Sequence, residues 1–570
     1  MANLARFLAA TLFAVLLVGG HAAHAQSLDD VFGFIPPIGP GRYPVGCSNV
    51  EQDFSRASGD PVAYWEGRGT AGTGYVIDLL VDPAHALVTN VTLPDDRDLY
   101  GNFRNRTLAF ASLVCYPTTA GNPYSDYALP NGRVVPRMQR GAQPPILADD
   151  RARFPVLLFS HGFGGSPLSS DYIEALKLFA SHGYVVVAPF HADSRIVDVR
   201  IDSLDDLLRA ILDFGNYTAM QAIRPRTLSI ALDALLADPN FAARIDPARI
   251  GGFGASLGGE SLLLMRGAQL TMSVGLSSKS VIDDPRLKAA VGYVPYFGQP
   301  FFPAFGRDQQ GLDGVSLPYL AIAGSEDTTA PSAATAAGML RLPGVVQLVL
   351  LAGVGHGFDV RSTGDIFTWA LEFLNGYVDL DPVSRATSAR MVRVNGGGAD
   401  ALLLDKAEPL PAGPGEDVIV EYYAPPLDHY FMTGDANEIA VLDAGVQFPG
   451  WQRTGYTFKA YAPATPAGIP ACRFFGRPGV GPSTHFFTVF ANECESLMNN
   501  NAWIFEGLVF RVERPDAIGA CPADRVPVVR VYNNGKGGTA NHRYLTSHSE
   551  ASLMVLQGWI IEGPVFCSLP

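Results

Sequence analysis

Cysteine is scarce in this sequence and absent from its middle. The chain has 570 residues and six cysteines, and no cysteine lies between residues 116 and 471. No Cys-x-x-Cys pair and no cluster of cysteine with histidine has the spacing of a zinc site. We therefore expect no bound metal and no cofactor.

Positive charge is also in short supply. Lysine and arginine number 41 against 55 aspartates and glutamates, which gives a formal net charge of −14. An acidic chain repels nucleic-acid phosphates, so we expect no nucleic-acid partner. Beyond Gly20 no apolar run is long enough to cross a bilayer, so we expect no transmembrane anchor.

The N-terminus has the pattern of a secretory signal peptide. A positive charge at Arg6 precedes the apolar run Phe7–Val18, and residues 23–25 (AHA) form a cleavage signal. We predict that residues 1–25 are removed and that the mature chain is secreted or periplasmic. No cysteine follows the apolar run, so a lipoprotein anchor is not indicated.

Export predicts an oxidising compartment, in which cysteines pair. Cys47 and Cys115 are the two early cysteines and are predicted to form one disulfide. The four late cysteines allow three connectivities. On proximity alone we favour the sequential pairs, which are Cys472 with Cys494 and Cys521 with Cys567.

Residues 26–390 alternate short apolar runs with amphipathic stretches of helix length. This alternation predicts an α/β domain with a doubly wound, mostly parallel sheet that helices cover on both faces. The segment 194–248 is longer than one crossover needs, and we expect it to form two helices and a cap over the sheet. The predicted strands cover residues 154–160, 184–188, 249–253, 289–294, 319–323 and 347–351.

A Pro/Gly-rich linker at residues 391–416 leads to three internal repeats in residues 417–570. Each copy carries a His-x-Phe/Tyr triplet and, further on, a tryptophan followed seven residues later by phenylalanine. We predict one smaller β-rich module, with the tryptophans in its core rather than on a platform for sugar rings. The triplets begin at His429, His485 and His542, and the tryptophans are Trp451, Trp503 and Trp559.

Residues 254–258 (GASLG) form a G-x-S-x-G motif. The motif follows the predicted strand 249–253 and opens a run with helical character. A sharp strand-to-helix turn of this kind is a nucleophile elbow, which raises a serine hydroxyl above the sheet. The helix N-terminus adds positive potential where an oxyanion would form. Ser256 is therefore the candidate nucleophile.

A serine hydroxyl needs a base, and the base needs an acid to orient it. His356 is the one histidine between Ser256 and the repeats, and it lies in a Gly-rich loop after the last predicted strand. Glu326 and Asp327 both follow the predicted strand 319–323, at the sheet edge where active sites form. We favour Asp327 and keep Glu326 as the alternative.

An oxyanion hole needs two backbone N–H donors. We expect one from Leu257, directly after the nucleophile, and one from Phe163 in the turn at residues 161–165 (HGFGG). His161 precedes this turn, and we interpret it as a structural hydrogen-bonding residue rather than as a base.

Four motifs together resemble the α/β-hydrolase branch that includes platelet-activating-factor acetylhydrolases, dienelactone hydrolases and bacterial cutinases. The resemblance covers about residues 40–380 and implies a serine ester hydrolase that acts through an acyl-enzyme, without a metal, on a small or polymeric ester. In the acetylhydrolases proper the acid follows the next strand, where residues 291–295 (VGYVP) offer none, so the cutinase-like position of Asp327 is favoured. The motifs are residues 160–165, 254–258, 323–331 and 355–358.

Other functions use the same residues. A binding or adhesion protein could carry the hydrolase domain as an inactive scaffold, although a scaffold has no need of a complete Ser–His–Asp set. A thioesterase or peptidase would use the same groups on another acyl bond. The repeats resemble a module of unknown function behind many secreted bacterial enzymes, and we expect them to hold the protein on a polymer or a cell surface.

Overall fold

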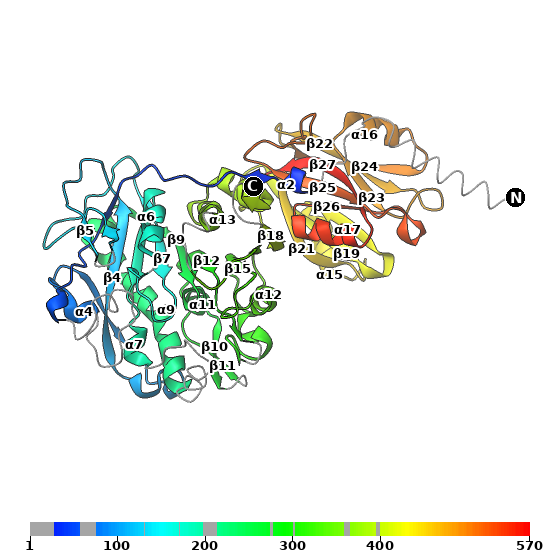
Figure 1. The fold of residues 1–570 in the computed structure, drawn as a ribbon. Helices are drawn as coiled ribbons and strands as arrows, with labels where there is room; N and C mark the ends of the chain where they lie inside the picture. Colours follow the sequence, from blue (N-terminus) through cyan, green and yellow to red (C-terminus); the bar gives the residue numbers. More distant parts are fainter. Residues whose placement is uncertain are drawn as a thin grey trace. The chain divides into compact units, whose positions relative to one another are not determined.

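The computed structural model describes residues 28–56, 76–129, 132–169, 172–197, 214–273, 277–299, 302–357, 365–394 and 400–570. The predicted signal peptide, residues 1–25, lies outside these ranges. The chain divides into a large unit, Ile35–Glu408, and a repeat unit, which comprises Pro409–Pro570 with the N-terminal residues up to Phe34. Figure 1 shows both units.

The large unit is built on one ten-stranded mixed sheet. Six central strands, from β16 to β8, run parallel, and their outer neighbours, β18 on one side and β4 on the other, are antiparallel to them. Across the sheet the order is β18 (Asp400–Lys406), β16 (Val346–Leu351), β15 (Tyr319–Gly324), β12 (Leu287–Tyr293), β9 (Ile245–Ala255), β7 (Phe154–Ser160), β8 (Val185–Pro189), β4 (Thr107–Pro117) and β2 (Val45–Cys47), while β3 (Leu87–Thr92) pairs with β4.

The six strands predicted from the sequence are the six parallel ones. Every residue of β7, β8 and β15 is buried, which is why they read as continuous apolar runs rather than as alternating ones. Residues 400–406, which the sequence analysis placed in the linker, instead form β18 and pair with β16. The linker prediction was wrong there because an edge strand with charged ends is recognised only by its partner.

Helices follow most of the parallel strands. The described helices of the large unit are α4 (Val76–Leu79), α5 (Arg97–Tyr100), α6 (Tyr172–Ser181), α7 (Asp193–Ile196), α9 (Phe214–Ala237), α10 (Pro239–Ala242), α11 (Leu257–Met265), α12 (Ser332–Met339), α13 (Asp365–Leu374) and α14 (Pro382–Arg390). Short hairpins pair β5 (Tyr127–Ala128) with β6 (Val134–Val135), β10 (Gln269–Ser273) with β11 (Ser277–Ser280), and β13 (Gly298–Gln299) with β14 (Phe302–Pro303).

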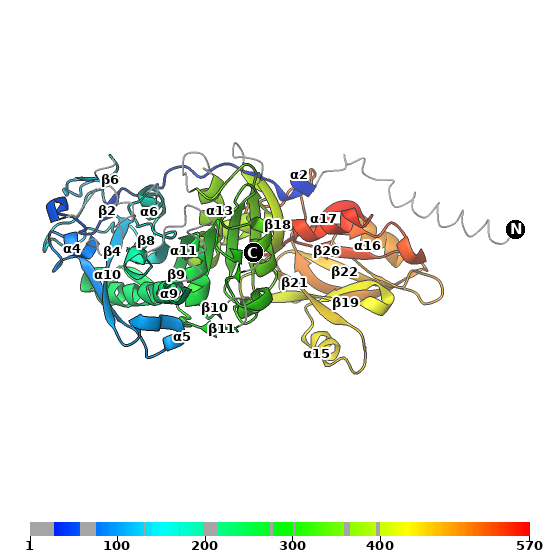
Figure 2. The same ribbon diagram turned by 60° about the horizontal axis from the view of Figure 1, so that its bottom comes forward.

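The predicted cap, residues 194–248, contains α9 as its longest described element. α9 packs against α11, β3 and β8, and Figure 2 shows it as the long helix beside α11. Most of its residues are buried, including charged Arg224. Residues 198–213 of the predicted cap lie outside the described residues, and the described part of α9 belongs to the core of the unit.

All six cysteines are paired. The bonds are Cys47–Cys115, Cys472–Cys494 and Cys521–Cys567, as predicted. Cys47 and Cys115 lie directly opposite each other on β2 and β4. These disulfides are consistent with a secreted protein. Within the described ranges, no helix combines the length and apolarity that crossing a membrane requires.

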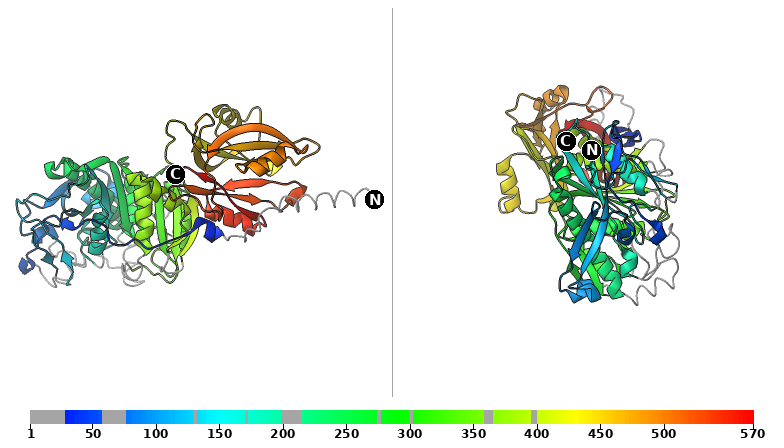
Figure 3. Two further views of the ribbon diagram at one scale, coloured as in Figure 1. Left: turned by 90° about the horizontal axis from the view of Figure 1, so that it is seen from above. Right: turned by 90° about the vertical axis from the view of Figure 1, so that its left-hand side faces the viewer.

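Each copy in the repeat unit consists of two strands, a helix and a third strand. The copies are β19 (Glu416–Ala424), β20 (His429–Thr433), α15 (Ala436–Ala444) and β21 (Gln452–Tyr461); β22 (Ile469–Gly476), β23 (His485–Thr488), α16 (Ala491–Met498) and β24 (Trp503–Val512); and β25 (Val526–Tyr532), β26 (His542–Leu545), α17 (His548–Leu556) and β27 (Ile560–Ser568). The first two copies share a six-stranded sheet, and the third has its own three-stranded sheet (Figure 3).

The three copies share one aromatic core. Phe510 meets both Phe458 and Phe566 edge-on, with ring centres 5.8 Å apart in each case. The tryptophans pack on the triplet strands: Trp451 on Phe431, Trp503 on Phe486, and Trp559 of the third copy on Tyr430 of the first. Trp559 is buried, as predicted, whereas Trp451 and Trp503 are partly buried at the border of the core.

An arginine joins the first copy to the second and another joins the second to the third. Arg473 of the second copy bonds Glu438 of the first at 2.8 Å, and Arg530 of the third bonds Glu493 of the second at 3.2 Å. In the pairing of the first strand with the third strand of each copy, Arg473 and Arg530 occupy the same position, and the first copy has Glu421 there.

We call each interface between two copies a seam. At the seam between the third copy and the first, the strand position that carries an arginine at the other two seams carries a glutamate instead. Arg543 of the third copy, at the middle of its triplet, bonds Glu421 at 2.9 Å and also Glu550 of its own helix. The other triplets have an aromatic residue at this position, Tyr430 or Phe486. All three seams therefore carry an arginine–glutamate contact, but at one of them the arginine comes from a different strand, and only there are both side chains buried.

The N-terminal segment belongs to the repeat unit. Helix α2 (Leu28–Phe32) contacts α17 and β27. His548 Nε2 lies 2.9 Å from Asp29 Oδ1, and the ring of Phe32 meets the ring of His548 edge-on. The first described residues are therefore attached to the third copy.

Candidate active site

Ser256 lies in a sharp turn between β9 and α11. Its φ of 54° and ψ of −121° are strained values for a residue with a side chain, as a nucleophile elbow requires. The flanking glycines are sterically necessary. A Cβ on Gly254 would lie 2.2 Å from the carbonyl carbon of Gly258, and a Cβ on Gly258 would lie 1.9 Å from the carbonyl oxygen of Ser160. The two glycines let the helix approach β7 and β9 closely.

The predicted nucleophile, base and acid lie in one hydrogen-bonded line. His356 Nε2 is 2.9 Å from Ser256 Oγ, and His356 Nδ1 is 2.8 Å from Asp327 Oδ2. The three residues follow β9, β15 and β16, so they meet at the carboxyl edge of the parallel strands. With the proton of His356 on Nδ1, the ring donates to Asp327 and accepts from Ser256.

The acid position is occupied by Asp327 rather than by Glu326. The Asp327 side chain is fully buried, and its second oxygen accepts the N–H groups of Thr329 at 2.9 Å and Ala330 at 2.8 Å. Glu326 is exposed to solvent. The two backbone donors fix the rotamer of Asp327, so the carboxylate is held toward His356.

The two predicted oxyanion donors lie on either side of the nucleophile. Leu257 is the first residue of α11, and Phe163 lies in the turn after β7. Among the described residues, neither N–H donates to a protein acceptor. The turn approaches closely, because a Cβ on Gly162 would lie 3.6 Å from Ser256 Cβ. Both N–H groups are therefore available to a substrate oxygen.

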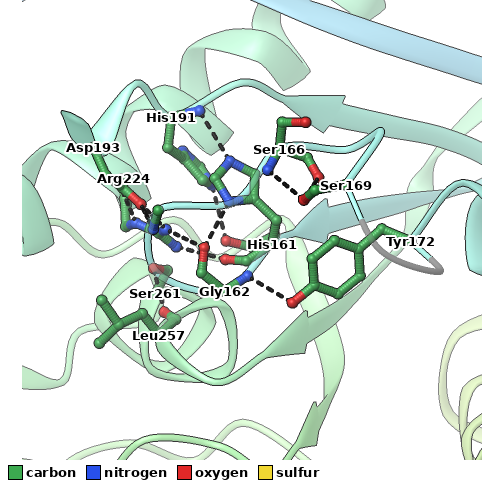
Figure 4. A network of polar contacts seen from close by, with 12 residues as sticks. His161, Gly162, Ser166, Ser169, Tyr172, His191, Asp193, Arg224, Leu257 and Ser261 are labelled. Atoms are coloured by element: carbon green, nitrogen blue, oxygen red, sulfur yellow. Dashed lines mark hydrogen bonds and ion pairs between the residues drawn. The ribbon is translucent and has the colours of Figure 1, made fainter. Parts of the chain in front are cut away.

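His161 is a structural residue of this turn. Its Nδ1 donates to the carbonyl oxygen of Gly162 at 2.8 Å, and its Nε2 accepts the N–H of His191 at 3.1 Å. Burial, with the Arg224 charge nearby, lowers the pKa of His161 to about 4, so the ring stays neutral. Figure 4 shows His161 between His191 and Gly162. A neutral ring with both nitrogens committed cannot act as the base.

A buried acid lies one helical turn beyond the nucleophile. Gln221 donates to Glu260 Oε1 at 2.7 Å, and Oε2 of Glu260 has no partner among the described residues. Burial raises the pKa of Glu260 to about 8. Three tyrosines lie near it: Tyr217, whose ring meets Phe163 edge-on at 6.2 Å, Tyr296, whose N–H donates to the Ser256 carbonyl, and Tyr319.

The described residues contain no group of three or more histidine, cysteine, aspartate or glutamate side chains placed to hold a metal ion. The comparisons with known proteins concern mainly the repeat unit. Residues 418–569 match the model of a domain of unknown function (DUF5648). No curated protein matches the chain. The large unit therefore has to be interpreted from its own geometry.

Proposed function

We propose that this protein is a secreted serine hydrolase of the α/β-hydrolase fold that cleaves carboxylic esters. The observation that carries the proposal is the Ser256–His356–Asp327 line, with contacts of 2.9 and 2.8 Å, at a strained strand-to-helix turn. Its position at the carboxyl ends of six parallel strands supports the fold assignment. The three disulfides support secretion.

In the proposed reaction the first step forms an acyl-enzyme. His356 Nε2 takes the proton of Ser256 Oγ as the oxygen attacks the ester carbonyl carbon. The carbonyl oxygen gains negative charge and accepts hydrogen bonds from the N–H groups of Phe163 and Leu257. His356 then gives its proton to the leaving alkoxide, and an alcohol departs.

Water completes the cycle. His356 removes a proton from the water molecule as its oxygen attacks the acyl carbon. His356 then gives this proton to Ser256 Oγ as the bond from the acyl carbon to Oγ breaks, and the carboxylic acid departs. Asp327 stays ionised throughout and stabilises the imidazolium that forms in both halves of the reaction. The aromatic rings of Phe163 and Tyr217 beside the turn favour an apolar acyl or alcohol group.

The test is turnover of p-nitrophenyl esters of increasing acyl length, with the wild-type protein beside Ser256→Ala. We expect ester hydrolysis by the wild type and a loss on the order of 10⁶-fold in kcat in the variant. The dependence of turnover on acyl length then indicates how long an acyl chain the site accepts. Absence of hydrolysis on every ester would reject the proposal, and a parallel assay on thioesters and peptides would tell whether another acyl bond is the target.

A further inference from the structure

One buried ion pair lies directly behind the turn that carries Phe163. Arg224 on α9 and Asp193 at the start of α7 are both buried. Arg224 Nε lies 2.9 Å from Asp193 Oδ1, and Arg224 Nη2 lies 2.5 Å from Asp193 Oδ2. Burial acts to raise the pKa of Asp193, but the Arg224 guanidinium outweighs it and the pKa is lowered. The pair is therefore a bidentate contact between two charged groups.

The other hydrogen bonds described for the pair are made to the main chain of the turn. Arg224 Nη1 donates to the carbonyl oxygen of His161 at 2.7 Å, and Nη2 donates to the carbonyl oxygen of Gly162 at 2.9 Å. Asp193 Oδ2 accepts the N–H of Gly164 at 2.9 Å. The pair thus holds the backbone on both sides of Phe163, as Figure 4 shows for the arginine.

The contact with Gly162 bears on the oxyanion hole through the geometry of the peptide bond. The carbonyl of Gly162 and the N–H of Phe163 belong to one trans peptide, so they point in opposite directions. A donor that fixes the carbonyl oxygen on the Arg224 side therefore turns the N–H away from Arg224. A hydrogen bond to the carbonyl also polarises the peptide and strengthens its N–H as a donor.

A stabilising role alone does not account for this pair. Burying two charges is costly, and apolar residues of similar size often serve stability equally well. Here the guanidinium of Arg224 makes four described hydrogen bonds. Two are to Asp193, and two are to backbone carbonyls of one turn. Such an arrangement fixes a backbone conformation, which apolar packing does not do.

We propose that Arg224 and Asp193 are positioning residues that hold the Gly162–Phe163 peptide with its N–H toward the carbonyl oxygen of a substrate bound at Ser256. The inference rests on the proposed function and adds two residues to it. Neither residue touches the reacting atoms, and both act through the backbone of the turn.

The test replaces the pair by apolar residues in the full-length protein, as Arg224→Met with Asp193→Leu. Because no charge is left unpaired, we expect a melting temperature within a few degrees of the wild type. We expect kcat on a p-nitrophenyl ester to fall by about 10²- to 10³-fold, with KM nearly unchanged, as for loss of one oxyanion donor. Affinity for a trifluoromethyl ketone, whose adduct with Ser256 carries an oxyanion, should fall by a similar factor.

The matched control is Asp284→Leu with Arg286→Met. This pair also joins an aspartate to an arginine, at 2.6 Å, but it lies at the beginning of β12, the end of the strand that faces away from the site. We expect wild-type kcat and wild-type affinity for the ketone in the control.

A second variant covers the case in which the double variant does not fold. Arg224→Lys keeps a positive charge beside Asp193 but cannot contact both carbonyls and the carboxylate together. We expect a folded protein with kcat reduced at least tenfold and KM retained. A folded variant of either kind with wild-type kcat and wild-type ketone affinity would overturn the positioning role while leaving the proposed function intact. A wild type that hydrolyses no ester would overturn both.

Discussion

Buried arginines occur in both units, but they are used differently. In the large unit Arg224 contacts one carboxylate and two backbone carbonyls, all in or beside a single turn. In the repeat unit Arg530 and Arg543 each pair with two carboxylates, one of them from another copy, and both lie over aromatic rings. The first arrangement fixes a local backbone shape, whereas the second fixes which segment packs on which. For these three arginines, the groups that the guanidinium contacts distinguish the residue beside the candidate site from the residues between copies.

The comparison predicts that changes in the large unit alter catalysis and that changes at the seams alter stability. The largest expected effect is on the acid of the triad. Asp327→Asn should lower kcat by about 10⁴-fold, because the imidazole loses both its orientation and the charge that stabilises it. Steady-state kinetics on a p-nitrophenyl ester measures this loss.

Glu326→Gln is the control for Asp327→Asn, since it changes a neighbouring exposed carboxylate. We expect wild-type kinetics. A large loss of kcat in Glu326→Gln with wild-type kcat in Asp327→Asn would show that Glu326 is the acid of the triad.

The next largest effect is expected at the seam between the third copy and the first. Arg543→Met leaves the buried Glu421 carboxylate without its cation, which should cost about 3–5 kcal/mol in the free energy of unfolding of the repeat unit. Chemical denaturation followed by tryptophan fluorescence measures it. The same change at the exposed Arg453, which pairs with Asp443, should cost at most about 1 kcal/mol.

A compensating change sharpens this prediction. Glu421→Arg with Arg543→Phe gives the first copy the arginine that Arg473 and Arg530 provide in the others, and it gives the third copy an aromatic residue like Phe486, over which Arg530 lies. The new arginine is expected to meet Glu550, so stability should recover relative to Arg543→Met. A double variant less stable than the single one would contradict the equivalence of the seams.

A smaller effect is expected from the buried acid near the nucleophile. The folded protein binds a proton on Glu260 up to a pKa of about 8, whereas the unfolded chain releases it near about pH 4.3. Between these values the folded state holds more protons, so stability falls as the pH rises. Glu260→Gln keeps an acceptor for Gln221 but has no proton to release, so the fall in stability with rising pH should be smaller in this variant.

Melting curves at about pH 5 and about pH 8 test it. The melting temperature of the wild type should be a few degrees lower at the higher pH, and that of Glu260→Gln should fall by less. Glu326→Gln, which changes an exposed carboxylate, should behave like the wild type. Equal pH dependence in all three proteins would show that Glu260 is not the group responsible.

The smallest effect on small substrates is expected from removal of the repeat unit. A chain that ends at Glu408 keeps the whole of the ten-stranded sheet. If the repeats hold the protein on a polymer or a cell surface, this chain should retain its turnover of soluble esters and lose activity on an insoluble ester. Equal activity on both would reject that role.

The sequence predicted the parts of the molecule that depend on local order. The buried parallel strands appear as apolar runs, and the triad residues follow three of them, so Ser256, Asp327 and His356 could be placed without knowledge of the tertiary structure. Cys47 and Cys115 could be paired because no other cysteine lies near them in the chain. In each case the signal lies in neighbouring residues.

Arg224 and Asp193 could not be found in the same way. They are 31 positions apart, and the segment between them gives no sign that α9 returns to the turn after β7. A lone arginine in a helix is usually interpreted as a surface residue. The partner of β18 was missed for the same reason, since Asp400–Lys406 becomes a strand only beside β16. Contacts between distant segments leave no pattern in a single sequence.

The inverted charges at the seam between the third copy and the first have a consequence for how many copies the unit can hold. If every seam had the same polarity, each copy would fit any other, and a fourth could be added or two chains could exchange copies. Glu421 would meet a like charge at the glutamate of α15 or α16 of another copy, whereas Arg543 of the third copy gives it a cation, so the first copy fits the third. A fourth copy added after the third would come between Arg543 and Glu421, so the reversal of charge disfavours lengthening of the unit at that end.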